Sequence, residues 1–532
     1  MQLRFIFLFA ILSIVLHAKA QFCANPQILG GQGGDACKSI VKIGQNLLVS
    51  GIYQQQMSLG PSNFSSAGGS DIFFVAYDSL GQIVFSKVLG NTQNNDLNSV
   101  CSDSFGNFYL SGTYSGQLQI DNIQLNSNLQ TSFIAKYSSN GQLLWAKQFN
   151  PKGIVHVLDL QVSPDGQFLW ISGDYNDSLF YGNDTLFCRN VYNLFALKLE
   201  TGNGNAIWMS DAPYAKWAKA KTICPLPDGT AWIAAEFRDS LQMAGRIYYH
   251  SPSHVDILMA RIDAVGNWMS HKRWGGVYDD EPKKMRLSPD ENSIWLIGDF
   301  VAVLAVDSFT LMTAFRYYDV FWVKMNLNAD AIAVGQTNTI ANAYVFDLAF
   351  QNNKIWLAGY FQDSLLGSLM HLTNGGFDAF LLGIDTSSAE IERSETLGGT
   401  GNDQIWGLCS SFASLVSVGI FQQQMNWQGS LMLQASGFSD GFMGCTETVL
   451  NKVDLIPKLL EVKIVPNPNN GKFSIELPDY EGLKWELYCM NAKRVLSGTS
   501  REIDASNLSK GIYSLSIKTS AGSAFAKIVI GK

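Results

Sequence analysis

A short pattern recurs seven times along this chain and constrains the fold more than any other feature of the sequence. Each copy is a hydrophobic run that ends in a small residue, with an aromatic residue two positions later. The copies read LLVSGIY, FYLSGTY, LWISGDY, AWIAAEF, IWLIGDF, IWLAGYF and LVSVGIF. Their small residues are Gly51, Gly112, Gly173, Ala235, Gly298, Gly359 and Gly419, so successive copies are 60 to 63 residues apart. Such regular spacing indicates a repeat architecture.

A second pattern follows the first in every copy. It reads DIFFVAY, TSFIAKY, NLFALKL, DILMARI, DVFWVKM, DAFLLGI and DGFMGCT, with apolar residues alternating as in β-strands. Another strand precedes the first pattern and one more follows the second after a turn, so each unit holds four short strands. Such units arranged around an axis predict an all-β fold, a seven-bladed β-propeller. An open-ended solenoid of the same units is the alternative.

Glycine-rich stretches near both ends of the repeat region resemble each other. Residues 28–39 read ILGGQGGDACKS and residues 397–407 read LGGTGNDQIWG. A phosphate-binding loop needs its glycines between a strand and a helix, whereas here a strand follows them. We therefore interpret both stretches as tight connections from the outer strand of one blade to the inner strand of the next. Four of the seven inter-blade connections carry an acidic residue, which is expected to cap backbone amides rather than to bind calcium, namely Asp35, Asp96, Asp280 and Asp403.

The seventh unit stops after its third strand. The N-terminal sequence FCANPQILGG aligns with the outer strand of the first unit, QIVFSKVLGN. We therefore expect the N-terminal strand to complete the seventh blade, because this closure removes the exposed sheet edges. The expected organisation is a signal peptide at 1–20, the propeller at 21–446, a linker at 447–460 and a C-terminal domain at 461–532.

The motifs LGG.G.D, D..GN.Y.SG and D.F.AKY...G.L.W resemble those of the extracellular bacterial propeller repeats called SBBP repeats. The first, second and seventh units match best, while the third to sixth keep the strand skeleton and lose the glycine signature. This resemblance implies an architecture and no particular reaction.

The N-terminus has the features of a secretory signal peptide. Arg4 precedes an apolar stretch from 5 to 16, and Ala18-Lys19-Ala20 forms a small-x-small cleavage site. Twelve apolar residues are too few to span a bilayer, and no later stretch is long enough either. The net charge of −8 argues against a nucleic-acid partner, which requires a basic surface.

The C-terminal residues 461–532 alternate short strands with Asn, Gly and Ser turns, as in a small immunoglobulin-like β-sandwich. They resemble the C-terminal sorting domain of the type IX secretion system of Bacteroidetes. The resemblance rests on Pro466, Asn467, Pro468, Gly471, Phe473, Tyr488, Lys493, Val495, Leu508, Gly511, Ile512, Tyr513 and Lys527 with the three residues after it. It implies the type IX machinery as a partner, and a protein that is secreted or attached to the cell surface.

Two sets of cysteines are informative. Cys101, Cys224 and Cys409 occupy the same inner-strand position in different blades, which predicts buried free thiols. Cys23 aligns with Ile83 of the first unit and Cys445 with Ala76, two positions expected to face each other across neighbouring strands. We therefore predict a Cys23–Cys445 disulfide in the oxidising exterior, with Cys23–Cys37 as the rival pairing.

Motifs that carry chemistry are scarce. Ser439 lies in GFSDG, but a hydrolase nucleophile elbow needs a strand–turn–helix context, and His250 and His254 lie in a Ser-Pro-Ser loop that predicts no metal site. No catalytic, metal or cofactor-binding residue is assigned. Five Asp-Ser/Thr-Leu stretches look like O-glycosylation acceptors of Bacteroidetes exported proteins, with turn chemistry as the alternative explanation. Their acceptors are Ser79, Ser178, Thr185, Ser240 and Ser364.

Two functional classes fit this sequence. A rigid propeller with variable loops suits an adhesion or binding module for a glycan or a protein. A secreted polysaccharide lyase or hydrolase acting at the mouth of the central channel is the alternative, but the inner strands are expected to be mainly apolar with Ser, Thr and Cys. We therefore expect a non-enzymatic, monomeric binding protein without a cofactor.

Overall fold

A computed structural model describes residues 26–212, 215–243, 246–249, 254–313, 316–366, 370–411, 414–427, 431–446, 462–477, 482–489, 494–519 and 522–531. These residues form strands, bridges and turns, and none of them is helical. The chain divides into two compact units, residues 1–448 and 449–532. The predicted signal peptide and linker lie outside the described residues. Within the described ranges, no segment forms a helix that is long and apolar enough to cross a membrane.

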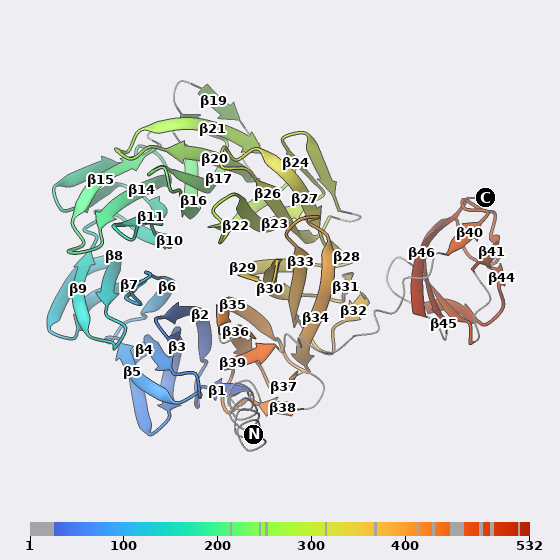
Figure 1. Cartoon of the computed structure of the whole chain (residues 1–532), viewed down its shortest axis with the longest axis horizontal. Helices are drawn as coiled ribbons and strands as arrows, with labels where there is room; N and C mark the ends of the chain where they lie inside the picture. The colour runs from blue at the N-terminus through green and yellow to red at the C-terminus, as the bar shows by residue number, and fades with distance from the viewer. Residues whose placement is uncertain are drawn as a thin grey trace, which may run out of the picture. The chain divides into compact units, whose positions relative to one another are not determined.

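The first unit is a ring of seven antiparallel sheets, each ordered from its inner to its outer strand (Figure 1). Blades 1 and 2 are β2 (Ala36–Ile43), β3 (Asn46–Leu59), β4 (Ser62–Tyr77), β5 (Ile83–Leu89) and β6 (Asp96–Ser102), β7 (Phe108–Ile120), β8 (Ile123–Tyr137), β9 (Leu143–Gln148). Blades 3 and 4 are β10 (Val155–Val162), β11 (Phe168–Tyr175), β14 (Asn193–Glu200), β15 (Ala206–Asp211) and β16 (Trp217–Pro225), β17 (Ala231–Arg238), β20 (Asp256–Ile262), β21 (Trp268–Trp274). Blades 5 and 6 are β22 (Asp280–Leu287), β23 (Ile294–Val301), β26 (Tyr318–Met325), β27 (Ala331–Gln336) and β29 (Ala343–Gln351), β30 (Lys354–Phe361), β33 (Asp378–Asp385), β34 (Ile391–Gly399).

The seventh blade combines strands from both ends of the unit. Its order is β35 (Gln404–Ser411), β36 (Ser414–Phe421), β39 (Asp440–Thr446) and then β1 (Gln27–Leu29). Residue Ile28 of β1 pairs with Phe442 of β39, as Val88 pairs with Phe73 in the first blade. The N-terminal strand therefore occupies the outer position of the blade in the register that the sequence alignment implies.

The aromatic residues of the recurring pattern lie in the core between blades. Tyr53, Tyr114, Tyr175, Phe237, Phe300, Phe361 and Phe421 are at most 1% exposed. Burying so large an apolar area once per repeat stabilises each blade against its neighbours, which explains why this position stays aromatic.

The register at the predicted disulfide corrects one expectation. In the first blade Ala76 pairs with Phe85, and a bulge follows, so that Ile83 pairs with Tyr77 and not with Ala76. The positions that align with Cys445 and Cys23 are thus offset by one pair rather than directly opposite. Cys445 is disulfide-bonded, whereas Cys37 is a free buried thiol, which excludes the rival Cys23–Cys37 bridge. Cys23 lies outside the described residues, so its pairing with Cys445 stays a prediction.

The variable segment between the second and third strands of each blade is a β-hairpin, which we call the finger. The blade 1 and 2 fingers continue the long strands of those blades. The others are β12 (Ser178–Tyr181) with β13 (Asp184–Phe187), β18 (Ser240–Met243) with β19 (Arg246–Tyr249), β24 (Val303–Val306) with β25 (Phe309–Met312), β31 (Ser364–Leu366) with β32 (Met370–Leu372), and β37 (Gln424–Trp427) with β38 (Leu431–Gln434).

Every finger starts in the same way. Its first residue has a positive φ, and the residues are Gln55, Gly116, Asp177, Asp239, Ala302, Asp363 and Gln423. The residue two positions later is apolar and at most 1% exposed, namely Met57, Leu118, Leu179, Leu241, Leu304, Leu365 and Met425. A left-handed residue turns the chain away from the blade, and the buried side chain fixes the finger to it.

Each finger also binds the connector, the segment that leads from the preceding blade into its own blade. Gly31 bridges to Met57, Gly275 to Ala305, and Gly398 pairs with Asn426. In the blade 6 connector β28 (Asn338–Thr339) pairs with β31. The glycine-rich connectors therefore serve as tight backbone crossings, as the sequence predicts, and no helix follows them.

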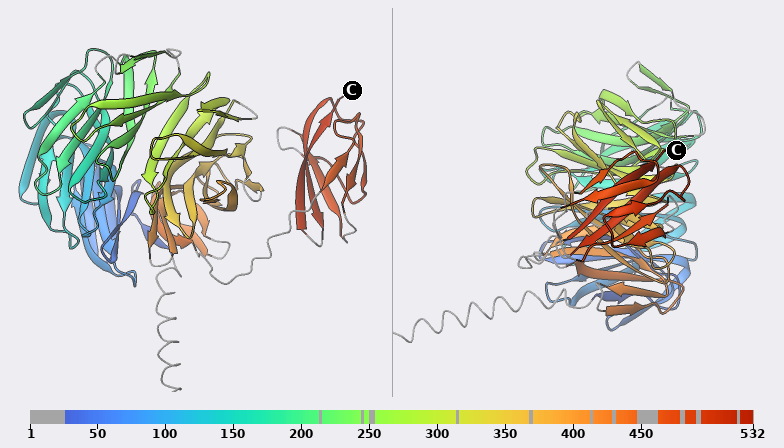
Figure 2. Two further views of the ribbon diagram at one scale, coloured as in Figure 1. Left: turned by 45° about the horizontal axis from the view of Figure 1, so that its top comes forward. Right: turned by 90° about the vertical axis from the view of Figure 1, so that its right-hand side faces the viewer.

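The second unit consists of two sheets (Figure 2). One contains β40 (Lys463–Val465), β41 (Lys472–Glu476) and β44 (Glu502–Asp504). The other contains β43 (Arg494–Gly498), β42 (Lys484–Tyr488), β45 (Gly511–Thr519) and β46 (Gly522–Ile530). Asn467 accepts a hydrogen bond from Val529 N at 2.8 Å, so the segment before β41 is tied to the last strand.

Other residues of the sorting motif are structural as well. Gly471 has a φ of +100°, and a Cβ on it would lie 2.6 Å from Ser506 Cα. Phe473 is buried in the core of this unit, and the Tyr513 hydroxyl donates to Ser509 O at 2.7 Å. Gly511 begins β45 opposite Ile530, and Lys527 is exposed on β46. The motif therefore specifies this small fold and leaves Lys527 accessible at its surface.

Candidate functional site

All seven inner strands carry a β-bulge at the same position. The extra residues are Lys38, Asn98, Leu158, Lys221, Lys283, Phe346 and Trp406. A bulge redirects a side chain and strengthens the local twist, and such irregularities are enriched beside functional sites. The bulges lie near the ends of the inner strands that the connectors enter, and we call this end of the ring the mouth.

The seven repeats differ strongly at the mouth although their cores are alike. The residue two positions before each bulge pairs with the variable residue of the pattern SGxY on the next strand. These pairs are Ala36–Ile52, Asp96–Thr113, His156–Asp174, Lys219–Glu236, Glu281–Asp299, Tyr344–Tyr360 and Gln404–Ile420. Only on blades 3 to 6 are both residues of the pair ionisable or aromatic.

Acidic and basic side chains lie next to each other along the mouth on blades 3 to 5, and we call these side chains the arc. Asp174 accepts from His156 Nδ1 at 3.1 Å and lies 4.0 Å from Lys219 Nζ of the next blade. Lys221 Nζ lies 3.1 Å from Glu236. The carboxyl groups are buried, at 0% exposure for Asp174, while the lysine side chains are each 26% exposed. The buried carboxylates thus hold ammonium groups in place at a surface that a ligand can reach.

The fifth blade contributes a tighter cluster. Lys283 Nζ lies 2.6 Å from Glu281 and 3.3 Å from the fully buried Asp299. Burial alone would lower the pKa of Lys283, but Asp299 and Glu281 together raise it above its ordinary value. Burial raises the pKa of Asp299 to about 7 despite Lys283. Lys283 therefore stays charged, and its exposed fraction of 19% lets it donate hydrogen bonds.

Blades 5 to 7 continue the mouth with aromatic rings. Tyr344 lies 5.0 Å from Tyr318 and 5.1 Å from Tyr360, measured between ring centroids. Phe346 lies 5.7 Å from Tyr360 and 6.1 Å from Trp406. All five side chains are only half-buried. They form a contiguous, partly exposed aromatic surface, a type of surface that proteins use for ligand contact.

An ion cluster lies deeper among the inner strands. The buried Asp159 on β10 is 3.2 Å from both Lys284 Nζ and Arg286 Nη1 on β22, which belongs to a blade that is not adjacent. Burial would raise the pKa of Asp159, but Lys284 and Arg286 outweigh it and lower the pKa to about 2. The expectation of mainly apolar inner strands with Ser, Thr and Cys is therefore wrong at these positions. The cluster links blades 3 and 5 below the mouth.

The inner-strand cysteines take the positions that the sequence predicts. Cys101 and Cys224 are buried free thiols, while Cys409 is free but half-buried. Burial raises the pKa of Cys224 and of Cys409 to about 12, so neither forms a nucleophilic thiolate at neutral pH.

The connector carboxylates cap amides, with one correction. Asp35, Asp280 and Asp403 each accept from the amide four residues earlier at 2.7 Å. In the blade 2 connector Asn95 does this at 2.8 Å, and Asp96 instead pairs with Lys38. The described residues contain no group of three or more potential metal ligands.

The remaining sequence candidates do not converge. Ser439 is buried and directly precedes β39, so no helix follows it as an elbow requires. His254 Nδ1 lies 3.3 Å from Asp279, while His250 lies outside the described residues. Ser178 and Ser364 are buried, Ser240 is half-buried, and Ser79 and Thr185 are exposed. In three of the five Asp-Ser/Thr-Leu stretches the Asp is the first residue of a finger, so turn geometry explains why the pattern recurs there.

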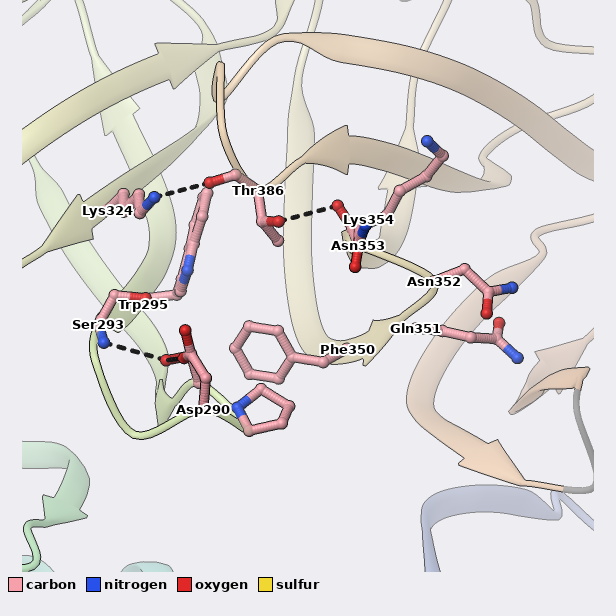
Figure 3. Close-up of a pocket in the computed structure, with 12 residues that line it drawn as sticks. Asp290, Ser293, Trp295, Lys324, Phe350, Gln351, Asn352, Asn353, Lys354 and Thr386 are labelled. Carbon is pink, nitrogen blue, oxygen red and sulfur yellow. Dashed lines mark hydrogen bonds between the residues drawn. The ribbon is translucent and has the colours of Figure 1, made fainter.

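A cavity of about 380 Å³ lies at the opposite ends of the inner strands, between the turns of blades 5 and 6 (Figure 3). Trp295, Phe350 and Lys324 line it, and Lys324 Nζ donates to Thr386 O at 2.7 Å. The Trp295 Nε1 donor is unpartnered but fully buried behind the cavity surface. We place the candidate site at the mouth, where charged and aromatic side chains are gathered.

The signal that sequence analysis missed is the variable residue of SGxY. It is acidic in three consecutive copies, SGDY, AAEF and IGDF, and these residues are Asp174, Glu236 and Asp299. Because side chains alternate between the two faces of a strand, three acidic residues at the same position near the end of the second blade strand could have pointed to the mouth.

Comparisons with known proteins identify the C-terminal region. Residues 463–531 match the family described as secretion system C-terminal sorting domain. No curated protein matches the chain. Among solved structures, the Neurospora crassa Pan2 WD40 domain is 8% identical with a TM-score of 0.40, covering 78% of this chain and 90% of that one. The WD40 β-propeller domain of Doa1 is 10% identical with a TM-score of 0.40, covering 79% and 96%.

A quinohemoprotein alcohol dehydrogenase from Comamonas testosteroni is 9% identical with a TM-score of 0.40, covering 81% of this chain and 78% of that one. Such distant likenesses carry no information about activity. The chain joins a β-propeller to a type IX secretion system C-terminal sorting domain, and it is an exported protein, secreted or held at the cell surface.

Proposed function

We propose that this protein is a non-enzymatic binding or adhesion module whose propeller holds a glycan at the mouth. The observation that carries the proposal is the asymmetry of the mouth, where a lysine-rich arc on blades 3 to 5 is followed by aromatic rings on blades 5 to 7. Flat apolar rings can cover one face of a sugar, while ammonium groups donate to its hydroxyl oxygens.

The charge balance of the arc favours a glycan over a strongly charged partner. Lys219, Lys221 and Lys283 lie next to Asp174, Glu236 and Asp299, so each cation has a carboxylate beside it. A highly acidic ligand would have to compete with these carboxylates. We further propose that the repeats are of the SBBP type, that the protein derives from Bacteroidetes, and that it acts as a monomer without a nucleic-acid partner or cofactor.

The experiment is a glycan array probed with the full mature chain, followed by titration of each hit. Tyr360→Ala and Trp406→Ala should each weaken binding at least tenfold. Phe105→Ala is the matched control, because Phe105 is 80% exposed in a turn at the opposite ends of the strands. Thermal unfolding of each variant checks that the ring remains folded. Equal binding by all three variants would contradict a site at the mouth.

The alternative is a secreted lyase or hydrolase that acts at the same mouth. It is favoured by Glu281 and Asp299, which pair across neighbouring strands, with the pKa of Asp299 raised by burial. Against it, Asp299 is fully buried and reaches no ligand directly. The assay is the release of new reducing or unsaturated ends from a bound polysaccharide. Release by the wild type that is lost in Glu281→Gln would show that the protein is an enzyme and not only a binding module.

A further inference from the structure

Five aromatic side chains form an unbroken row across the mouth, and we call this row the strip. Neighbouring ring centroids lie 5.0 to 6.1 Å apart, and the members in order are Trp406, Phe346, Tyr360, Tyr344 and Tyr318. Trp406 and Phe346 lie on inner strands, which surround the centre of the ring in Figure 1. Tyr318 begins β26, the third strand of blade 5. The strip therefore runs from the edge of the central channel outward over blades 7, 6 and 5.

Polar and aromatic groups near the blade 5 connector continue the strip at its outer end. The Tyr318 hydroxyl donates to Asp279 Oδ2 at 3.1 Å, and His254 Nδ1 lies 3.3 Å from Asp279 Oδ1. The His254 ring centroid lies 5.3 Å from that of Tyr278. The side chains of His254 and Asp279 are 32% and 30% exposed. Accessible groups therefore extend from the inner strand of blade 7 to the residues just before the third strand of blade 4.

The middle of the strip offers hydroxyl groups that the protein itself does not use. Among the described residues, the hydroxyls of Tyr344 and Tyr360 have no hydrogen-bond partner, and both side chains are half-buried. The Tyr318 hydroxyl, in contrast, already donates to Asp279. A phenol hydroxyl can both donate and accept, which suits the hydroxyl groups of a sugar. A short ligand should therefore gain most at Tyr344 and Tyr360.

The charged groups at the two ends of the strip already have partners. At the inner end, Lys38 Nζ lies 5.9 Å from the centroid of the Trp406 ring and forms a salt bridge with Asp96. At the outer end, Asp279 accepts from Tyr318 and lies beside His254. A charged sugar would have to displace one of these partners, whereas a neutral sugar gains apolar contact and hydrogen bonds without doing so.

We infer that the glycan of the proposed function is a neutral linear chain that lies along the strip, with successive sugars on successive rings. The inference rests on that function and adds the shape and charge of the ligand. A single terminal sugar would use one or two of the five rings, because a pyranose and a phenol ring are both six-membered. A chain that covers the whole strip buries one ring after another, and each ring adds apolar area to the contact.

The test is isothermal titration of the full mature chain with neutral cello-, manno- and xylo-oligosaccharides of two to six sugars, and with acidic oligogalacturonides of the same lengths. In at least one neutral series the Kd should fall at least tenfold from the disaccharide to the hexasaccharide. The acidic series should bind more weakly at every length. Equal Kd values at all lengths, or tighter binding of the acidic series, would overturn the inference.

Variants along the strip locate the contacts that longer chains add. Tyr318→Ala should weaken binding of the hexasaccharide at least fivefold and leave the disaccharide within twofold, because the disaccharide lies on Tyr344 and Tyr360. Tyr360→Ala should weaken both lengths, and the control Phe105→Ala neither. Equal weakening of both lengths by Tyr318→Ala would contradict an extended contact. Thermal unfolding checks each variant, and the wild-type length series decides the matter if a variant does not fold.

Failure of this inference differs from failure of the proposed function. Hits on the glycan array that are confined to branched or terminal sugars, with no gain along any linear series, would overturn the linear chain and leave glycan binding in place. An array without hits, together with no binding in any series, would overturn the proposed function and the linear chain with it.

Discussion

A Cβ atom on Gly399 would lie 1.7 Å from the backbone oxygen of Gln424, which belongs to the finger of the seventh blade. The same relationship joins Gly31 to Gln56 and Gly276 to Val303, at 1.7 Å in both cases. The second glycine of the connector motif is therefore required because a finger backbone passes directly beneath it. This contact, more than conformational freedom, explains the glycines that mark the repeats.

Gly399→Ala should destabilise the propeller by roughly 1 to 3 kcal/mol, because the finger must shift to admit the methyl group. Gly202→Ala is the matched control, since a Cβ there would meet nothing within 4 Å. Equilibrium unfolding in urea measures both. An unchanged midpoint for Gly399→Ala would show that the finger does not press on the connector.

Asp159→Asn should remove the part of the folding stability that the deep ion cluster loses in acid. The carboxyl pKa of Asp159 is lowered to about 2, so its stabilising effect is present above the ordinary value of 3.8 and is lost as pH falls through 2. A shift of this size corresponds to about 2 kcal/mol at pH 7. The variant should be less stable than the wild type at pH 7, and the difference should vanish near pH 2. A constant difference at all pH values would contradict the ion-pair explanation.

Reduction should destabilise the ring if Cys23 and Cys445 are joined as predicted. The bond would close a loop of more than 400 residues between the two ends of the propeller. Such closure contributes about 2 to 4 kcal/mol in typical proteins. Peptide mapping without reduction should recover one linked peptide that contains both cysteines. Free thiols at both positions would contradict this closure, although β1 would still pair with β39.

Deleting residues 461–532 should leave a folded propeller that remains in the periplasm of a type IX-competent host. The two units are separately compact, and only the second matches the sorting family. In the native protein we expect this domain to be removed on arrival at the surface, which intact mass would reveal. Normal surface display of the truncated chain would show that the sorting domain is dispensable.

The sequence predicts the repeats, the strand-rich blades and the sorting domain because each depends on local alternation and turn residues. It misses the mouth for a physical reason. Lys283 and Phe346 are bulge residues. A bulge changes which side chains face inward, but it does not change the alternation of apolar and polar residues in the sequence. The one-residue errors at Asn95 and at Ala76 arise in the same way, since local register depends on three-dimensional pairing.

Hydrogen–deuterium exchange with and without a glycan identified by the array tests the central claim most directly. We predict protection of residues 344–346, 404–406 and 281–283, which carry the aromatic rings and Lys283, with no change in the turn 103–107 at the opposite end. Protection confined to the finger tips, with the inner strands unchanged, would contradict a ligand site at the mouth of the propeller.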